Sequence, residues 1–537
     1  MKQFKNIQMK TKNIILYVFI IFSCFGCEEF LEEDPRALIS PETFFASEND
    51  ARQAVNGIYA ILKNNSIYGQ EGLDHYYDYG ADIVEPNRSI TFVEPIGAYT
   101  MNEAIADRSV QKMGVADTWK DLYRVINNVN TTIQEVTGNE AINQDAQTEI
   151  IAEVRFIRAL CYWHITNLWG DAPFYTEALL LEEIAALGRT DKATIIASVM
   201  TDLEFAYANM LSDSEISDDQ RGRASKWAAA VVMAKVYMQQ QQWGPALAKC
   251  EEIIGQSGYE ILPNYADVFD LANEYNAEII WSLDFAKDIR GQFEEGGVNA
   301  DGTLRAAFGN GMWRPSMFNP RLRDEPKNTA ERGALRDALT ARGEAFNGTG
   351  IEIASKDFAE KFPLNDLRRP LNVMQNYLGF ELNFPYMPKF MNLDLATSPR
   401  FNHADNRLVF RLADVVLMAA ECENELNGPG NAYQYIHQIR ERAYATQAEW
   451  ELTGLSQEEF RQAIYDERKW ELAGEAQRRY DLIRWGILLD VVQNAEFRQW
   501  PANENIRPHH VLLPIPLSQL QLNPALLESD PTNNGYR

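Results

Sequence analysis

The feature that most constrains the fold of this chain is a helical unit that occurs twice. In the first copy Val231-Val232 precede Gly244-Pro245 by 13 residues, and in the second Val415-Val416 precede Gly428-Pro429 by the same 13 residues. Each copy has the pattern of an alanine-rich helix, a Gly-Pro turn and a second helix, because Gly and Pro together interrupt a helix and let the chain reverse. One such pair cannot bury its apolar face alone, so the sequence predicts stacked helix pairs.

Four further segments predict helices, with apolar residues at three- and four-residue spacing or in long apolar stretches. They span residues 117–136, 147–169, 193–210 and 225–241. The segment 147–169 is stopped by Gly170-Asp171-Ala172-Pro173, a strong helix breaker. The helix pairs resemble tetratricopeptide-type repeats, in which small residues allow close packing. We therefore expect a mainly α fold in which tetratricopeptide-like helix pairs form a superhelical scaffold, with long irregular loops and a few short strands.

The stretch between the two repeated units has a different character. Over residues 255–405 helical periodicity is poor, and Gly, Pro, Asn and aromatic residues are frequent. Residues 278–283 predict a strand, and residues 291–310 a long glycine-rich loop. We expect a single domain over residues 27–537, with the helical scaffold mainly at 40–260 and 405–490. The loop-rich insert at about 261–404 is expected to bind the ligand, since recognition usually lies on loops held by a rigid scaffold.

The first residues have the pattern of an export signal. Residues 1–13 are basic and polar, and the apolar run 14–22 is too short to span a bilayer. Gly26 then precedes Cys27, as in the lipobox of bacterial lipoproteins. Residues 1–26 are therefore predicted to be a lipoprotein signal peptide, and Cys27 to be the lipidated residue, with palmitate among the acyl groups. Cys24, which follows Ser23, remains an alternative acceptor. Such a lipid would anchor the mature chain to a membrane.

Charge and cysteine content exclude other classes. The signal peptide holds four of the 50 basic residues and no acid, so the mature chain has 46 basic and 77 acidic residues, a net charge of −31. So acidic a surface repels phosphate backbones, and no nucleic-acid partner is expected. The mature body holds three cysteines, Cys161, Cys250 and Cys422, each in a helical stretch. An odd number without paired spacing predicts small buried residues and not a disulfide framework.

A series of motifs along the chain resembles the SusD/RagB family of outer-membrane nutrient-binding lipoproteins. After Cys27 the motifs occupy residues 30–35, 152–159, 167–173, 225–229, 411–415, 419–422, 467–472, 478–486, 513–516, 523–524 and 534–536. Their order and spacing, together with the lipobox, make the resemblance specific, and it covers nearly the whole chain.

The resemblance implies a location and a function. It implies a lipid-anchored protein of the outer membrane of a Gram-negative bacterium, facing the cell surface. Family members cap a SusC-like TonB-dependent transporter and pass oligosaccharide or polysaccharide to it in nutrient uptake. An oligopeptide-binding, RagB-like protein of the same transporter system is the alternative, and the sequence does not decide between the two.

Catalysis is not expected. Glu467, Glu471 and Glu475 recur at four-residue spacing, where like charges could raise a carboxyl pKa for acid catalysis. Arginines share the segment, however, and Glu475 with Arg479 has the spacing of a favourable helical ion pair, so a structural ion-pair ladder is the better interpretation. The histidines form no metal-ligand spacing, and His164 is expected to be a core residue. No metal, cofactor or enzymatic function is predicted.

Aromatic residues outside clear helical stripes are the candidates for ligand contact, because sugar C–H faces stack on flat rings. The alternative for each is that it anchors a loop to the core. The candidates are Tyr76, Tyr77, Tyr79, Phe92, Tyr99, Trp313 and Phe318.

Overall fold

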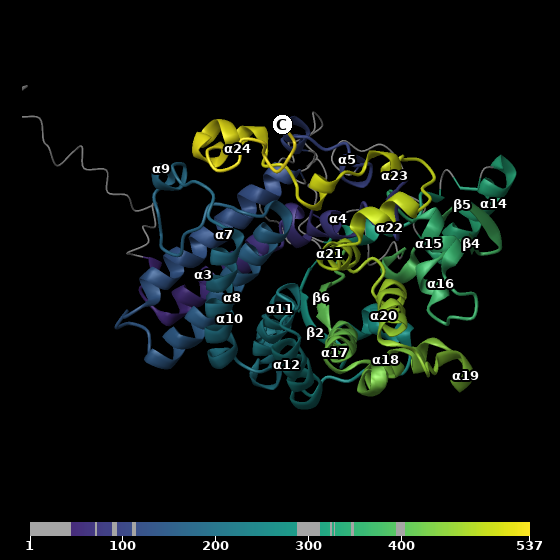
Figure 1. The fold of residues 1–537 in the computed structure, drawn as a ribbon, viewed down its shortest axis with the longest axis horizontal. Helices are drawn as coiled ribbons and strands as arrows, with labels where there is room; N and C mark the ends of the chain where they lie inside the picture. The colour runs from purple at the N-terminus through teal and green to yellow at the C-terminus, as the bar shows by residue number, and fades with distance from the viewer. Residues whose placement is uncertain are drawn as a thin grey trace, which may run out of the picture.

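The computed structural model describes residues 44–69, 72–87, 94–109, 114–286, 312–322, 325–326, 328–344, 348–393 and 403–537. The predicted signal peptide, Cys24, Cys27, Phe92 and the loop 291–310 lie outside these residues. The described part is mainly helical (Figure 1). This confirms the predicted mainly α fold.

The N-terminal helices are α3 (Glu48–Leu62), α4 (Gly72–Asp78), α5 (Glu94–Gly97), α6 (Glu103–Ala106), α7 (Val115–Val136), α8 (Gln144–Trp169), α9 (Leu181–Ile184), α10 (Lys192–Asn209), α11 (Lys226–Gln239) and α12 (Trp243–Gln256). The insert holds α13 (Arg314–Phe318), α14 (Thr329–Arg342), α15 (Lys356–Lys361) and α16 (Arg369–Asn372). The C-terminal helices are α17 (Leu412–Asn427), α18 (Pro429–Ala443), α19 (Gln447–Trp450), α20 (Gln457–Glu471), α21 (Arg478–Arg484), α22 (Leu488–Asn494), α23 (Ala502–Asn505) and α24 (Leu517–Leu522). In the described part six strands form three two-stranded antiparallel sheets, which pair β1 (Val84–Pro86) with β3 (Glu352–Ala354), β2 (Ile279–Leu283) with β6 (Arg407–Arg411), and β4 (Met374–Tyr377) with β5 (Phe380–Tyr386).

The predicted scaffold helices are present close to their expected bounds. The segments 117–136, 147–169, 193–210 and 225–241 correspond to α7, α8, α10 and α11. Helix α8 ends where predicted because Gly170 adopts a φ of 73°, a left-handed conformation that glycine takes at little cost. Cys161, Cys250 and Cys422 are buried and free, as predicted. Among the described residues no helix is both long and apolar enough to cross a membrane.

The two repeated units stack on each other. They are the pairs α11–α12 and α17–α18, and α12 packs directly against α17 although the insert separates them in sequence. Neighbouring pairs continue the stack, with α7 on α8, α8 on α10, α10 on α11, and α20 against α17 and α18 (Figure 1). The alanines of α11 are fully buried, so small side chains let these helices approach closely.

The insert leaves and rejoins the scaffold through one strand pair. The predicted strand is β2, which pairs with β6, and β6 leads directly into α17. The insert also has a small apolar core of its own, which includes Leu322, Leu335, Ile353 and Tyr386. The chain therefore enters and leaves the insert at the same place, beside the stacked helices.

The segment around Tyr76 differs from the sequence prediction. It lacks helical spacing in the sequence, yet residues Gly72–Asp78 form helix α4. All seven of its residues are buried. A helix that is buried on every side needs no polar face, so it leaves no amphipathic pattern to detect.

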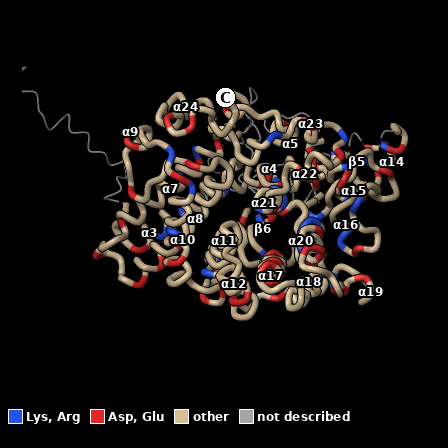
Figure 2. Tube along the Cα trace, viewed as in Figure 1, with Lys and Arg blue, Asp and Glu red and all other residues tan. Residues whose placement is uncertain are grey.

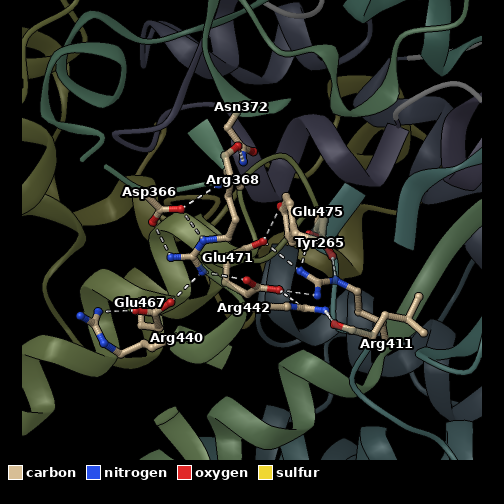
Figure 3. A network of polar contacts seen from close by, with 12 residues as sticks. Tyr265, Asp366, Arg368, Asn372, Arg411, Arg440, Arg442, Glu467, Glu471 and Glu475 are labelled. Atoms are coloured by element: carbon tan, nitrogen blue, oxygen red, sulfur yellow. Dashed lines mark hydrogen bonds and ion pairs between the residues drawn. The ribbon is translucent and has the colours of Figure 1, made fainter. Parts of the chain in front are cut away.

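A buried network of ion pairs links the insert to the C-terminal helices (Figure 3). At its centre Glu471, the last residue of α20, accepts hydrogen bonds from Arg368 at 2.8 Å, Arg411 at 2.6 Å and Arg442 at 2.7 Å. Glu278, next to β2, accepts further bonds from Arg411 and Arg442. Acidic and basic positions lie side by side around α20 and β6 (Figure 2). The network thus joins α16, β2, β6, α18 and α20.

This geometry makes Glu471 an anion at neutral pH. Burial alone would raise the pKa of its carboxyl group, but Arg442, Arg411 and Arg368 outweigh burial and hold the pKa well below its ordinary value. A carboxylate so stabilised is a poor proton donor. Glu467 and Glu475 also form buried ion pairs, so the prediction that these three glutamates take part in ion pairs is confirmed.

One predicted ion pair is wrong. Glu475 pairs with Arg411 and Lys389 and not with Arg479. The reason is that α20 ends at Glu471 and α21 begins at Arg478, so the two residues do not share a helix. Gly474 lies between the two helices with a φ of 72°.

We expect Glu471→Gln to lower the free energy of unfolding by about 3–5 kcal/mol, because it leaves three buried guanidinium groups without their shared counter-charge. Glu458→Gln is the matched control, since Glu458 is 79% exposed and pairs with Arg461 at the surface. Exposed pairs of this kind contribute about 0–1 kcal/mol. Urea unfolding followed by circular dichroism measures both, and equal effects of the two substitutions would contradict the central role of Glu471.

Candidate functional site

A pocket lies where the insert meets β2 and β6. It is walled by two short 3₁₀ helices, η5 (Tyr265–Phe269) and η8 (Pro388–Phe390), by the start of α13, and by residues on both strands. It encloses about 640 Å³ of empty space, part of it open to solvent. The side chains that matter for recognition are Phe269, Leu271, Glu274, Lys389, Phe390, Asp405 and Asn406. We call it the insert pocket.

Two aromatic rings form an apolar wall of the insert pocket. Phe269 and Phe390 are half-buried, and their ring centroids are 5.7 Å apart with the planes at 85°. The ammonium of Lys389 lies 4.5 Å from the centre of the Phe269 ring. The guanidinium of Arg314 lies 3.6 Å from the centre of the Phe390 ring. Such cation–π contacts fix the ring planes while leaving apolar surface toward the pocket.

Both cations are themselves held by buried carboxylates. Lys389 forms an ion pair with Glu475, and Arg314 pairs with Asp74 at 2.9 Å. Burial lowers the pKa of Lys389 to about 8, against the opposing effect of Glu475. Because Glu475 also binds Arg411, the aromatic wall is connected to the buried network of Figure 3.

Carboxyl and amide groups line the other side of the insert pocket. The backbone N–H of Asn406 donates to Glu274 Oε1 at 2.5 Å, and Asp405 Oδ1 accepts from the Asn392 side chain at 2.8 Å. Burial raises the pKa of Glu274 to about 7, with Asp405 and Asp284 adding to the rise and the Asn406 hydrogen bond opposing it. Burial also raises the pKa of Asp405 to about 6.

This combination suits a polyhydroxylated ligand. Flat apolar rings can contact the C–H faces of a sugar, and carboxyl and amide groups can exchange hydrogen bonds with its hydroxyls. Within the described ranges, no group of three or more His, Cys, Asp or Glu side chains is arranged to hold a metal ion.

Four of the predicted ligand-contact residues, Tyr76, Tyr77, Tyr79 and Tyr99, lie in or near the core around α4. Each is no more than 6% exposed. The Tyr76 hydroxyl is 3.0 Å from Thr118 Oγ1, and the Tyr77 hydroxyl is 3.0 Å from His164 Nδ1. These contacts give the tyrosines a packing role in this structure, and their contact with a ligand stays a prediction. His164 is a buried core histidine, as predicted, and burial lowers its pKa to about 3.

Trp313 and Phe318 lie directly behind the insert pocket. Trp313 is 2% exposed, and its neighbours Met312 and Arg314 both line the pocket. Phe318 is 1% exposed and packs against Phe390 with ring centroids 5.1 Å apart. Their contact with a ligand stays a prediction, and the aromatic rings that line the insert pocket are those of Phe269 and Phe390.

Sequence reasoning missed Phe269, Phe390, Glu274 and Asn406. The two phenylalanines lie in 3₁₀ turns of only five and three residues, which are too short to show periodicity. For Phe269 and Glu274 the sequence did hold one signal, because both shortly precede the predicted strand at residues 278–283.

Comparison with known proteins supports one family. The family model described as "SusD family" matches residues 363–536, and the model described as "Starch-binding associating with outer membrane" matches residues 29–238. The chain is 70% identical over 529 residues to SusD-like protein P25 of Formosa agariphila, covering 98% of this chain and 100% of that protein. It is 26% identical to the starch-binding protein SusD of Bacteroides thetaiotaomicron, over 72% of each chain.

Solved structures share the fold. A laminarin-binding SusD-like protein superposes with a TM-score of 0.68 at 22% identity, over 89% of this chain and 98% of that one. The surface glycan-binding protein A of Bacteroides thetaiotaomicron, in complex with laminarihexaose, gives a TM-score of 0.69 at 18% identity, over 88% and 97%. With the stacked helix pairs and the ordered motifs, these relations lead to one conclusion: the chain belongs to the SusD/RagB family.

Proposed function

We propose that this protein is a surface-exposed lipoprotein that binds oligosaccharide or polysaccharide and passes it to a SusC-like TonB-dependent transporter of the outer membrane. The observation that carries the glycan assignment is the insert pocket, whose lining combines the Phe269 and Phe390 rings with carboxyl and amide groups. Family relatives named as laminarin-binding or starch-binding support the same ligand class. We assign it binding and not turnover.

The scaffold and the insert divide this function between them. The stacked helices provide a rigid support, and the loops of the insert carry the ligand contacts. We propose that Cys27 carries the lipid that holds the protein at the outer membrane, and that residues 1–26 are removed. Transfer to a transporter requires that the glycan be released, so we expect moderate affinity and fast dissociation.

The first test is calorimetric titration of the purified protein with soluble polysaccharides, laminarin and starch fragments among them, and with oligopeptides. We expect saturable binding of a glycan without cleavage.

Phe390→Leu keeps the apolar packing and removes the flat ring, so it should weaken glycan binding at least about tenfold, which corresponds to about 1.4 kcal/mol.

The matched control is Phe174→Leu, the same substitution at a half-buried ring that packs on Tyr162 outside the insert pocket. It should leave the affinity unchanged. Binding of peptides alone would move the assignment to an oligopeptide carrier, and cleavage of the glycan would refute a pure binding role. An equal loss of affinity in both variants would place the site elsewhere.

The raised pKa of Glu274 predicts a pH effect on stability. Its folded-state pKa of about 7 exceeds the ordinary value of 4.5, so the protonated carboxyl is favoured in the folded protein. The stability of the parent protein that depends on a protonated Glu274 is fully present below about pH 4.5 and is lost as the pH rises through about 7. The difference in melting temperature between Glu274→Gln and the parent protein should therefore increase in favour of the variant as the pH rises from 5 to 8. The control is Glu331→Gln at an exposed position on α14, and a difference that stays constant across this range would contradict the prediction.

Lipid attachment can be tested in a bacterium that processes lipoproteins, by feeding a labelled fatty acid. Cys27→Ala should abolish incorporation of label and release the protein from the membrane fraction. Cys24→Ala should retain both. The reverse pattern would identify Cys24 as the acceptor.

A further inference from the structure

A buried arginine in α21 has no counter-charge. Arg479 is 3% exposed, and its guanidinium donates to the backbone carbonyls of Tyr76 and His510. It also lies beside Tyr99, whose pKa burial raises and Arg479 lowers. Its Nε–H is buried without a hydrogen-bond acceptor. Carbonyls and a tyrosine hydroxyl carry no full charge, so the positive charge of Arg479 is not neutralised by these contacts.

Arg479 is an exception within this protein. Each of the other buried lysines and arginines of the described ranges forms an ion pair with a carboxylate. A buried charge without a partner is costly, because the protein interior replaces water poorly. The expected Glu475–Arg479 pair is absent, and among the described residues no other acid pairs with Arg479.

Arg479 lines a second cavity, separate from the insert pocket. It encloses about 1070 Å³ of empty space, part of it open to solvent, between the end of α8, the start of α10, α21 and the C-terminal segment. The chain after α24 returns to the end of α8, where the Asn534 side chain donates to the backbone carbonyl of Trp169 at 3.0 Å. Asp171, which is exposed, stands at the opening. We call this space the α21 cavity.

Two other donors of the α21 cavity are also unused. Asn167 is 8% exposed, and its Oδ1 accepts a hydrogen bond from Gln239. Its Nδ2 is buried and makes no hydrogen bond of good geometry, although it lies near the Tyr77 hydroxyl. Lys192 is half-buried and forms no ion pair, and burial lowers its pKa against the opposing charge of Asp171. The cavity thus offers three donors from three elements.

The acidic residues of the α21 cavity do not neutralise the positive charge of its lining. Asp530 is engaged by Arg189 at 3.0 Å and by the backbone N–H of Asn534 at 2.7 Å. Asp171 accepts from the backbone N–H of Lys192 at 2.9 Å. With Arg189, Lys192 and Arg479 against Asp171 and Asp530, the lining carries one net positive charge at neutral pH.

We propose that the α21 cavity binds an oxyanion, a carboxylate or sulfate group, through Arg479, Asn167 and Lys192. The anion would supply the missing counter-charge and accept the unused N–H bonds, as charge-assisted hydrogen bonds to an oxyanion do. The group can belong to an acidic sugar or to a free anion. This site does not rest on the glycan assignment of the insert pocket, and either can fail alone.

The test uses the purified full chain at constant ionic strength in a chloride buffer. Sodium sulfate and sodium glucuronate are titrated separately by calorimetry, with glucose as the neutral control. We expect saturable binding of at least one anion and none of glucose. Sulfate alone indicates a free anion or sulfate ester, and glucuronate alone indicates an acidic sugar. Absence of saturable binding for both anions overturns the proposal.

Arg479 also holds two backbone carbonyls, so the variants leave it intact. Lys192→Gln should weaken anion binding at least about tenfold, whereas Lys120→Gln, at an exposed lysine of α7 outside the cavity, should not. Asn167→Asp keeps the acceptor for Gln239 and introduces a carboxylate into the cavity. It should raise the melting temperature in chloride buffer without sulfate or glucuronate, and it should abolish binding of both anions. Unchanged affinity in both Lys192→Gln and Asn167→Asp would overturn the proposal.

Discussion

The carboxylate of Glu471 determines how the insert is attached to the helical scaffold. Three arginines reach it from the start of α16, the end of β6 and the last turn of α18. Hydrophobic burial has no direction, whereas a fully buried carboxylate is stable only if its donors arrive at defined positions. The insert packs Phe318, Phe358 and Phe362 into the main apolar core and has a small core of its own, and the contacts of Glu471 add defined positions to this burial. Any shift of β6 against α20 would separate Arg411 from Glu471.

The insert pocket depends on the same network. Glu475 holds both Arg411 and Lys389, and Lys389 in turn lies over the Phe269 ring. A chain of charges therefore runs from the centre of Figure 3 to the aromatic wall. Sugars are recognised by ring faces at fixed orientation, and half-buried rings on short 3₁₀ turns would otherwise be mobile. The charges that stabilise the junction thus also orient the rings.

Features that leave a local pattern in the sequence could be predicted, and features formed by residues distant in sequence could not. Helix α7 has an apolar stripe, α8 has a long apolar run with a clear stop, and the offset between Val415-Val416 and Gly428-Pro429 identifies the second repeated unit. Helix α4 leaves no stripe because it is buried on every side. The aromatic wall is formed by residues distant in sequence, Phe269 and Phe390, which no local pattern connects. The expected Glu475–Arg479 pair failed because spacing alone does not show that a helix ends between two residues.

The fold and the ligand contacts are also constrained to different degrees. Solved relatives at about one-fifth identity retain the helical stack, because stacking needs only small and apolar residues at the right period. Ring positions such as Phe390 lie in the insert, where no repeat constrains the residue, so a shared fold does not transfer a ligand. The buried charges differ in how they are compensated. Arg411 and Glu471 form an ion pair, whereas Arg479 pairs with no carboxylate of the described residues, and a buried charge without a counter-charge persists at a cost in stability. Such a cost at a cavity wall is more easily explained by a bound counter-ion than by packing.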